Sequence, residues 1–173
     1  MKIEFPLSEE DRIQVECYNS NVVVDLIPPF DPTVHCSHGF PFNETESIPY
    51  KHQAIIHSDV RDIRCKIHFR ISLGNCGCLQ TYDGRPDHLI NINNRHLFPY
   101  AWLLRILFSI QSARYTVMAA YNTANDLRLF SSGGNLMSIH IYHNLRVAFG
   151  GFLNLLQMDY TDIYKCLLCG SQP

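Results

Sequence analysis

The stretch Asp62-Ile63-Arg64-Cys65-Lys66-Ile67-His68-Phe69-Arg70-Ile71-Ser72 alternates strictly between apolar and polar residues. A period of two is typical of a β-strand with one buried side and one solvated side. The pattern therefore predicts a half-solvated antiparallel strand over residues 62–72. We expect Gln53–His57 to pair with it across a turn at Ser58-Asp59.

The polar side of this strand is basic, and it has two interpretations. It is either a solvated face or a ridge that binds phosphate groups, and we favour the solvated face. The chain has a net charge of −2, from 14 Lys+Arg and 16 Asp+Glu, whereas a self-sufficient nucleic-acid-binding domain usually carries a basic surface. The candidate nucleic-acid-binding residues are Arg64, Lys66, His68 and Arg70.

The segments before this strand also favour β-structure. Ile13–Cys17 and Asn21–Ile27 are short runs of β-forming residues. Pro28-Pro29 ends the second run, because proline cannot donate a hydrogen bond to a neighbouring strand. Asp31–Pro49 is rich in Pro, Gly, Asn and Ser, and we predict a long loop there.

Helical patterns follow residue 84. Apolar spacing predicts helices from Pro99 to Gln111, from Tyr115 to Phe130 and from Met137 to Met158. The expected fold class is α+β, with a small N-terminal antiparallel β unit followed by a C-terminal three-helix part. We expect two subdomains, 1–84 and 85–173.

The chain has no apolar stretch near the ~20 residues that span a bilayer, and no apolar signal core at its start. We therefore expect a nuclear or cytoplasmic protein without membrane contact. Seven cysteines in a reducing compartment favour free thiols or metal ligands over disulfides.

The sequence has three groups of closely spaced cysteines or histidines. Two of them, His35–His38 and Gly74–Cys78, together predict a zinc site. Zinc prefers four thiolate or imidazole ligands in a tetrahedron, and ligands on glycine-containing turns can face one ion. Such a site would attach the long loop to the end of the strand. The Cys₃His ligands would be Cys36, His38, Cys76 and Cys78.

The third group, Cys166-Leu167-Leu168-Cys169, is a Cys-x-x-Cys pair close to Pro173. Its partners in a zinc site would be Cys76 and Cys78 or residues beyond Pro173. The alternative is a dithiol without metal, and a redox role is disfavoured because the pair follows a helix. Cys65 is expected to be a buried thiol.

The sequence contains no recognisable signature for nucleophilic catalysis and no glycine-rich phosphate loop. We therefore expect no enzymatic activity and no small-molecule substrate. A thiol-dependent enzyme is the alternative that the cysteines and histidines leave open.

The order of several motifs resembles one known group. The chain is similar to the region of HMG domain-containing protein 3-like proteins that is related to Kyakuja–Dileera–Zisupton (KDZ) transposases. The similarity extends over roughly Cys36–Pro173. Its motifs are His38-Gly39-Phe40-Pro41, Cys65–Arg70, Gly74–Cys78, Tyr82-Asp83-Gly84-Arg85, Leu89–Asn94, His96-Leu97-Phe98 and Tyr164–Pro173.

The resemblance implies that an RNase H-like catalytic core begins just after the Cys166/Cys169 pair. The chain is then expected to be a non-catalytic accessory portion, or a truncated product, of a transposase-derived protein. No HMG box is present. Its role would be to bind a protein partner or DNA ends, the alternative being a protein-interaction domain without a nucleic-acid role.

Overall fold

The computed structural model describes residues 23–130 and 136–156. A seven-stranded sheet precedes three helices, so the predicted α+β class is confirmed. The strands are β1 (Val24–Leu26), β2 (Phe42–Pro49), β3 (Ala54–His57), β4 (Asp62–Ser72), β5 (Leu79–Gln80), β6 (Leu89–Ile92) and β7 (His96–Pro99). The helices are the 3₁₀ turn η1 (Arg85–Asp87), α2 (Tyr100–Ala113), α3 (Val117–Phe130) and α4 (Ile139–Leu155).

Strand β4 has the predicted bounds and is the central strand of the sheet. Its first half pairs with β1 and β3, and its second half pairs with β2 and β5. Cys65 and Ile67 are fully buried, as the alternation predicted. Ser72 was expected on the solvated side but is buried, because β2 and the cysteine-bearing turns cover that end of the strand.

The β-hairpin predicted between Gln53–His57 and the strand at residues 62–72 is present. β3 runs antiparallel to β4, with His57 opposite Asp62. Residues 58–61 form the turn, in which the Ser58 backbone N–H donates to the Arg61 carbonyl at 3.0 Å. Ser58 Oγ donates to the same carbonyl at 3.0 Å, so the short polar side chain stabilises the reversal of the chain.

The predicted loop Asp31–Pro49 is partly wrong, because its second half forms β2. Phe42 is buried and pairs with Ser72, and the pairing is irregular before Ser47. The paired residues lie between 19 (Pro49 and His68) and 30 (Phe42 and Ser72) positions apart in sequence, so local composition did not reveal the pairing. The run Asn21–Ile27 contains only the short strand β1, whereas Ile13–Cys17 lies outside the described residues.

The sheet continues past residue 84. The β6–β7 hairpin turns at Asn93 and Asn94, which adopt left-handed φ values of 55° and 53°, a conformation that asparagine tolerates better than most residues. β7 then runs parallel to β3, and β1 runs parallel to β4. The sheet is therefore mixed rather than purely antiparallel. The first long helix begins at Tyr100, one residue from the predicted start at Pro99.

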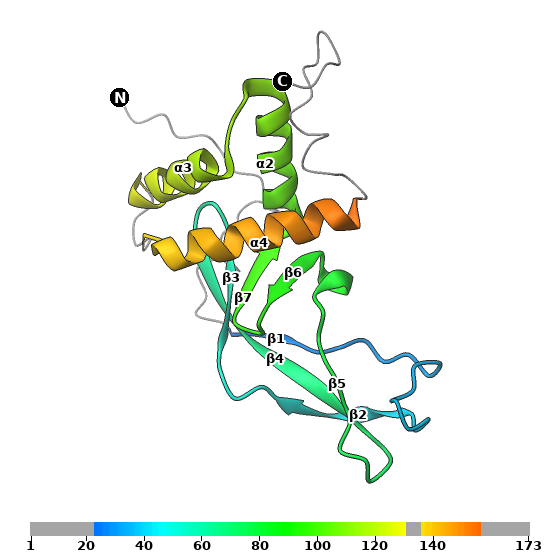
Figure 1. The fold of residues 1–173 in the computed structure, drawn as a ribbon. Coiled ribbons are helices and arrows are strands. Elements are labelled where there is room, and N and C mark those ends of the chain that lie inside the picture. The colour runs from blue at the N-terminus through cyan, green and yellow to red at the C-terminus, as the bar shows by residue number, and fades with distance from the viewer. Residues whose placement is uncertain (1–22, 131–135, 157–173) are drawn as a thin grey trace, which may run out of the picture.

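Figure 1 shows the three helices gathered at one end of the sheet, with β2 and β5 toward the other end. Adjacent residues of β7 enter different cores, because side chains alternate along a strand. Leu97 joins the sheet core with Cys65 and Ile67, whereas Phe98 joins the helical core around Leu103. Within the described ranges, no helix is both long enough and apolar enough to cross a membrane.

Two glycines offer a matched test of this fold. Gly84 has φ +87°, and an added Cβ would lie 2.5 Å from the Leu89 carbonyl oxygen. Gly84→Ala is therefore expected to reduce the free energy of unfolding by about 1–3 kcal/mol. Gly151, within α4, has open space where a Cβ would lie, so Gly151→Ala should raise it by about 0.5–1 kcal/mol.

Urea titration followed by Trp102 fluorescence measures both changes. Equal stabilities for Gly84→Ala and the parent chain would contradict the conformation assigned to Gly84.

Candidate metal centre

The first half of the candidate site is a tight turn over residues 35–41. Cys36 N–H donates to the Phe40 carbonyl and Gly39 N–H donates to the Cys36 carbonyl, both at 2.9 Å. Gly39 has φ +80°, a conformation that favours glycine. The turn brings Cys36 and His38 to the same site, with Cys36 buried and His38 exposed.

The second half follows directly from the end of β4. Ser72 N–H donates to the Cys78 carbonyl at 3.0 Å, and Gly77 between the two cysteines has φ +67°. Leu73 N–H donates to the Pro41 carbonyl at 2.9 Å. The end of β4 is therefore hydrogen-bonded to both turns and aligns them.

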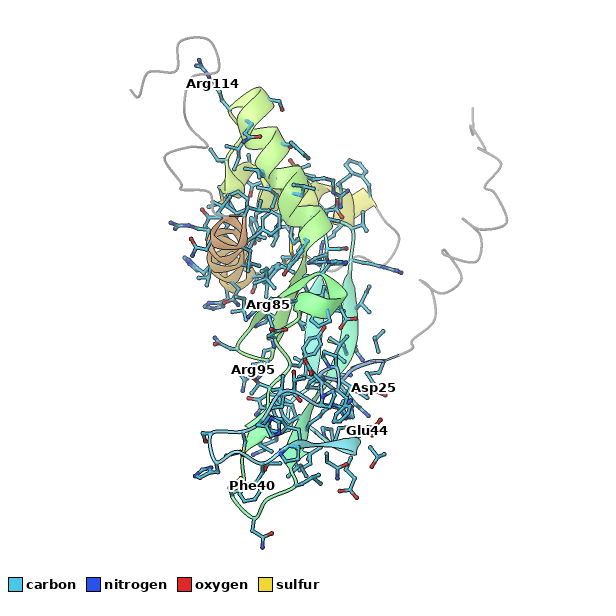
Figure 2. All side chains as sticks on the ribbon, turned by 90° about the vertical axis from the view of Figure 1, so that its right-hand side faces the viewer. Asp25, Phe40, Glu44, Arg85, Arg95 and Arg114 are labelled. Carbon is cyan, nitrogen blue, oxygen red and sulfur yellow. The ribbon has the colours of Figure 1, made fainter. Side chains whose placement is uncertain are left out.

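A close contact between Gly74 and Phe40 also joins the turns. A Cβ at residue 74 would lie 2.4 Å from the Phe40 ring, so only glycine allows this contact. In Figure 2, Phe40 lies near one end of the molecule and Arg114 near the other. The site therefore lies at the end of the sheet away from the helices.

Four ligand atoms converge at this point, from Cys36, His38, Cys76 and Cys78. We call these residues the Cys/His cluster, and their ligand atoms all lie within 4.8 Å of one another. The Sγ atoms of Cys36 and Cys76 are 3.6 Å apart, and Cys78 Sγ lies 3.4 Å from His38 Nδ1.

The two shorter separations, 3.6 Å between sulfurs and 3.4 Å between sulfur and nitrogen, suit tetrahedral zinc. Zinc–sulfur bonds of about 2.3 Å and zinc–nitrogen bonds of about 2.0 Å place two sulfurs about 3.8 Å apart, and sulfur and nitrogen about 3.5 Å apart. A disulfide would need about 2.05 Å between sulfurs. The cluster can therefore hold a metal ion, and its donor atoms are those that zinc prefers.

Ser72 supports the cluster, and the sequence reasoning did not identify it. Its hydroxyl lies 3.5 Å from Cys36 Sγ and 3.2 Å from Cys76 Sγ. The hydrogen bond from Ser72 is the main cause that lowers the pKa of Cys36 to about 6, with backbone N–H groups at His38 and Phe40 also contributing. The position of Ser72 at the end of a strand that leads into a cysteine turn was the available signal.

The pKa of Cys78 is raised rather than lowered. The Ser37 hydroxyl acts to lower the pKa of Cys78, but the hydrogen bond with Cys76, burial and the neighbouring thiolates together raise it. A metal ion would remove this conflict, because thiolates bind the cation instead of repelling one another.

The predicted pairing of Cys36 and His38 with Cys76 and Cys78 is thus present in the structure. Cys166 and Cys169 lie outside the described residues. Cys65 does not join the cluster: it is fully buried in the sheet core, and this burial raises the pKa of its thiol to about 12.

The four residues of the predicted basic ridge have different environments. Arg64 and Lys66 are exposed. Arg70 donates to the carbonyls of Pro28 at 2.7 Å and Asn43 at 3.0 Å, and also to that of Glu44. His68 lies 3.2 Å from both Ser47 Oγ and Asp25 Oδ1. Two of the four side chains therefore hold β1 and β2 against β4.

Comparison of the chain with protein-family models, with curated proteins and with solved structures gave no match. The resemblance to KDZ transposase-related proteins stays a prediction.

The different surroundings of the cysteines generate a test. In chelator-treated protein at about pH 7.5, iodoacetamide should modify the half-exposed Cys78 while Cys65 stays unmodified. Burial both blocks access to Cys65 and disfavours the reactive thiolate. Mass spectrometry of peptides from the folded protein measures the rates, and denatured protein, in which Cys65 should react, is the control. Equal rates at the two sites in folded protein would refute the assigned burial.

Proposed function

We propose that this chain is a non-catalytic α+β module stabilised by one Zn²⁺ ion bound to the Cys/His cluster. The main support for this proposal is the convergence of four protein ligand atoms at one point. Structural zinc sites have four protein ligands, whereas catalytic sites keep one position for water or substrate. A Cys₃His set fills the tetrahedron, which supports a structural role.

The position of the cluster supports the same role. Among the described residues, few side chains beside the two turns are buried, namely Cys36, Phe42 and Ser72. The large apolar clusters lie around the first half of β4 and under the helices. A small unit with little apolar core needs another source of stability, and a metal ion can supply it. Zinc would thus hold residues 35–41 against the end of β4.

We further propose that the module is an accessory part of a transposase-derived nuclear or cytoplasmic protein, and that it binds a protein partner. The motif series that resembles the KDZ-related region motivates the first part. The proposal of a protein partner is supported by the hydrogen bonds that His68 and Arg70 make within the chain. Asp25 also lies opposite Lys66 in the β1–β4 register. These features reduce the charge available for phosphate contacts.

DNA binding is the second candidate function, because Arg64 and Lys66 are exposed on the same side of β4. The two functions differ in salt dependence. Two phosphate contacts predict a slope near −2 in a plot of log affinity against log salt, and therefore a loss of about tenfold between roughly 50 and 200 mM salt.

We expect any DNA binding to follow this shallow dependence and to disappear in an Arg64→Glu/Lys66→Glu variant. Fluorescence anisotropy with a labelled duplex measures it. A loss of about a thousandfold or more over the same range would require many more contacts, and would favour a DNA-binding module over the protein-partner proposal.

Zinc content tests the metal centre. Protein purified without chelator is expected to contain about one zinc per chain. Cys76→Ser should lose it, because a hydroxyl replaces one thiolate ligand. Cys65→Ala should keep it, since Cys65 lies outside the cluster, and it therefore serves as a matched control for removing a cysteine. Inductively coupled plasma mass spectrometry measures the ratio of zinc to protein.

Cys166→Ser distinguishes the two zinc arrangements that the sequence left open. Retention of zinc in this variant indicates a complete Cys/His cluster. Loss of zinc would show that the Cys166/Cys169 pair shares the ion, and absence of zinc from the parent protein would reject the metal centre.

A further inference from the structure

A second polar cluster lies at the opposite end of β4 from the Cys/His cluster. His57 is 2% exposed, and its Nδ1–H donates to Asp62 Oδ1 at 2.8 Å. The other nitrogen of the ring, Nε2, lies 2.9 Å from Nδ1 of His96 on β7. A continuous hydrogen-bonded chain therefore runs from Asp62 through His57 to His96.

The same carboxylate joins the sheet to a helix. Arg128 of α3 is 1% exposed, and its Nη2 donates to Asp62 Oδ1 at 2.7 Å and to the Ser58 carbonyl at 2.6 Å. A burial this complete makes the arginine's contacts with the β3–β4 turn costly to break. The turn is also joined to α2 by an ion pair between Arg105 and Asp59 at 2.9 Å, in which the arginine is largely exposed.

Hydrogen counting limits the charge that this chain of side chains can hold. Only one hydrogen can lie between His57 Nε2 and His96 Nδ1. When both rings are neutral, His57 donates to Asp62 and accepts from His96. When one ring is cationic, one tautomer still satisfies every bond. When both rings are cationic, two N–H donors face each other at 2.9 Å, and the bond must break.

We propose that Asp62, His57, His96 and Arg128 form a pH-sensitive latch that holds α3 on the β3–β4 hairpin and weakens when both histidines are protonated. The latch does not depend on the metal centre.

The charges around the latch oppose the second proton. His96 faces the ring of His57 and lies near Arg95, whereas Asp62 supplies the negative charge. Burial first, and then the positive charges of His57 and Arg95, lower the pKa of His96. Burial alone would raise the pKa of Asp62, but the hydrogen bonds from His57 and Arg128 outweigh it and keep the carboxylate ionised.

The sign of the effect follows from the proton balance. Histidines in an unfolded chain titrate near about pH 6.5, so the unfolded state takes up two protons at these positions below that pH. The intact latch takes up one. Because the unfolded state binds more protons, stability falls as the pH falls, by about tenfold in the folding equilibrium constant per pH unit.

The test compares the parent chain, as purified without chelator, with a His96→Asn variant. The asparagine amide can either donate to or accept from His57 Nε2, and it does not titrate. The variant should therefore lack this acid sensitivity. His140→Asn is the matched control, because His140 is an exposed histidine on α4. The folding constant of this variant should change with pH as that of the parent does.

Urea unfolding at pH values between about 6.5 and 5 supplies the data. The single tryptophan, Trp102, is a suitable fluorescent probe, because its ring lies 6.1 Å from Phe98, whose ring is 5.4 Å from His57. We expect the parent to lose about tenfold more in its folding constant per pH unit than His96→Asn. Equal slopes would overturn the latch. Acid release of zinc affects all three chains alike and cannot imitate the difference.

If His96→Asn does not fold, NMR of the parent chain decides the question. Imidazole carbon shifts of His57 and His96 should show one protonation while backbone amides of β3 and β7 stay protected from exchange, and a second protonation only as that protection is lost. Two protonations with full protection would reject the proposal.

Discussion

The pairing of β4 along both of its edges is the constraint on which the rest of the structure depends. Its eleven residues are long enough to hold β1 and β3 on one half and β2 and β5 on the other. A strand in the middle of a sheet satisfies its backbone hydrogen bonds on both sides, which short peripheral strands such as β1 and β5 cannot do alone. Of the other strands in the described part of the chain, all but β6 and β7 pair with β4 directly.

The two ends of β4 are stabilised in different ways. At the Asp62 end, the helical core and the contacts of Arg128 hold the sheet. At the Ser72 end, few apolar side chains are buried, and the Cys/His cluster takes their place. A metal ion there would be coupled to folding, because its four ligands come from two segments about 40 residues apart, which only the paired β4 brings together.

Some features were predictable because they depend on local patterns. Strict alternation defined β4, apolar spacing located the three helices within a few residues, and glycine-containing cysteine turns indicated the ligand set. β2 was missed because Asn, Glu, Ser and Pro dominate its composition and its pairing partner is distant in sequence. β6 and β7 were missed because each has only four residues, too few for a clear period.

The sequence by itself determined the fold class, the central strand and the residue types of the candidate site, since these follow from side-chain period and from the chemistry of thiols and imidazoles. Only the tertiary structure decided which side chains are available for function. The sequence predicted Arg70 and His68 as part of a basic surface, yet both form hydrogen bonds to neighbouring segments of the sheet. His57 and Arg128 carry no sequence signal, because their partners lie on other elements and their burial arises only when the helices pack on the sheet.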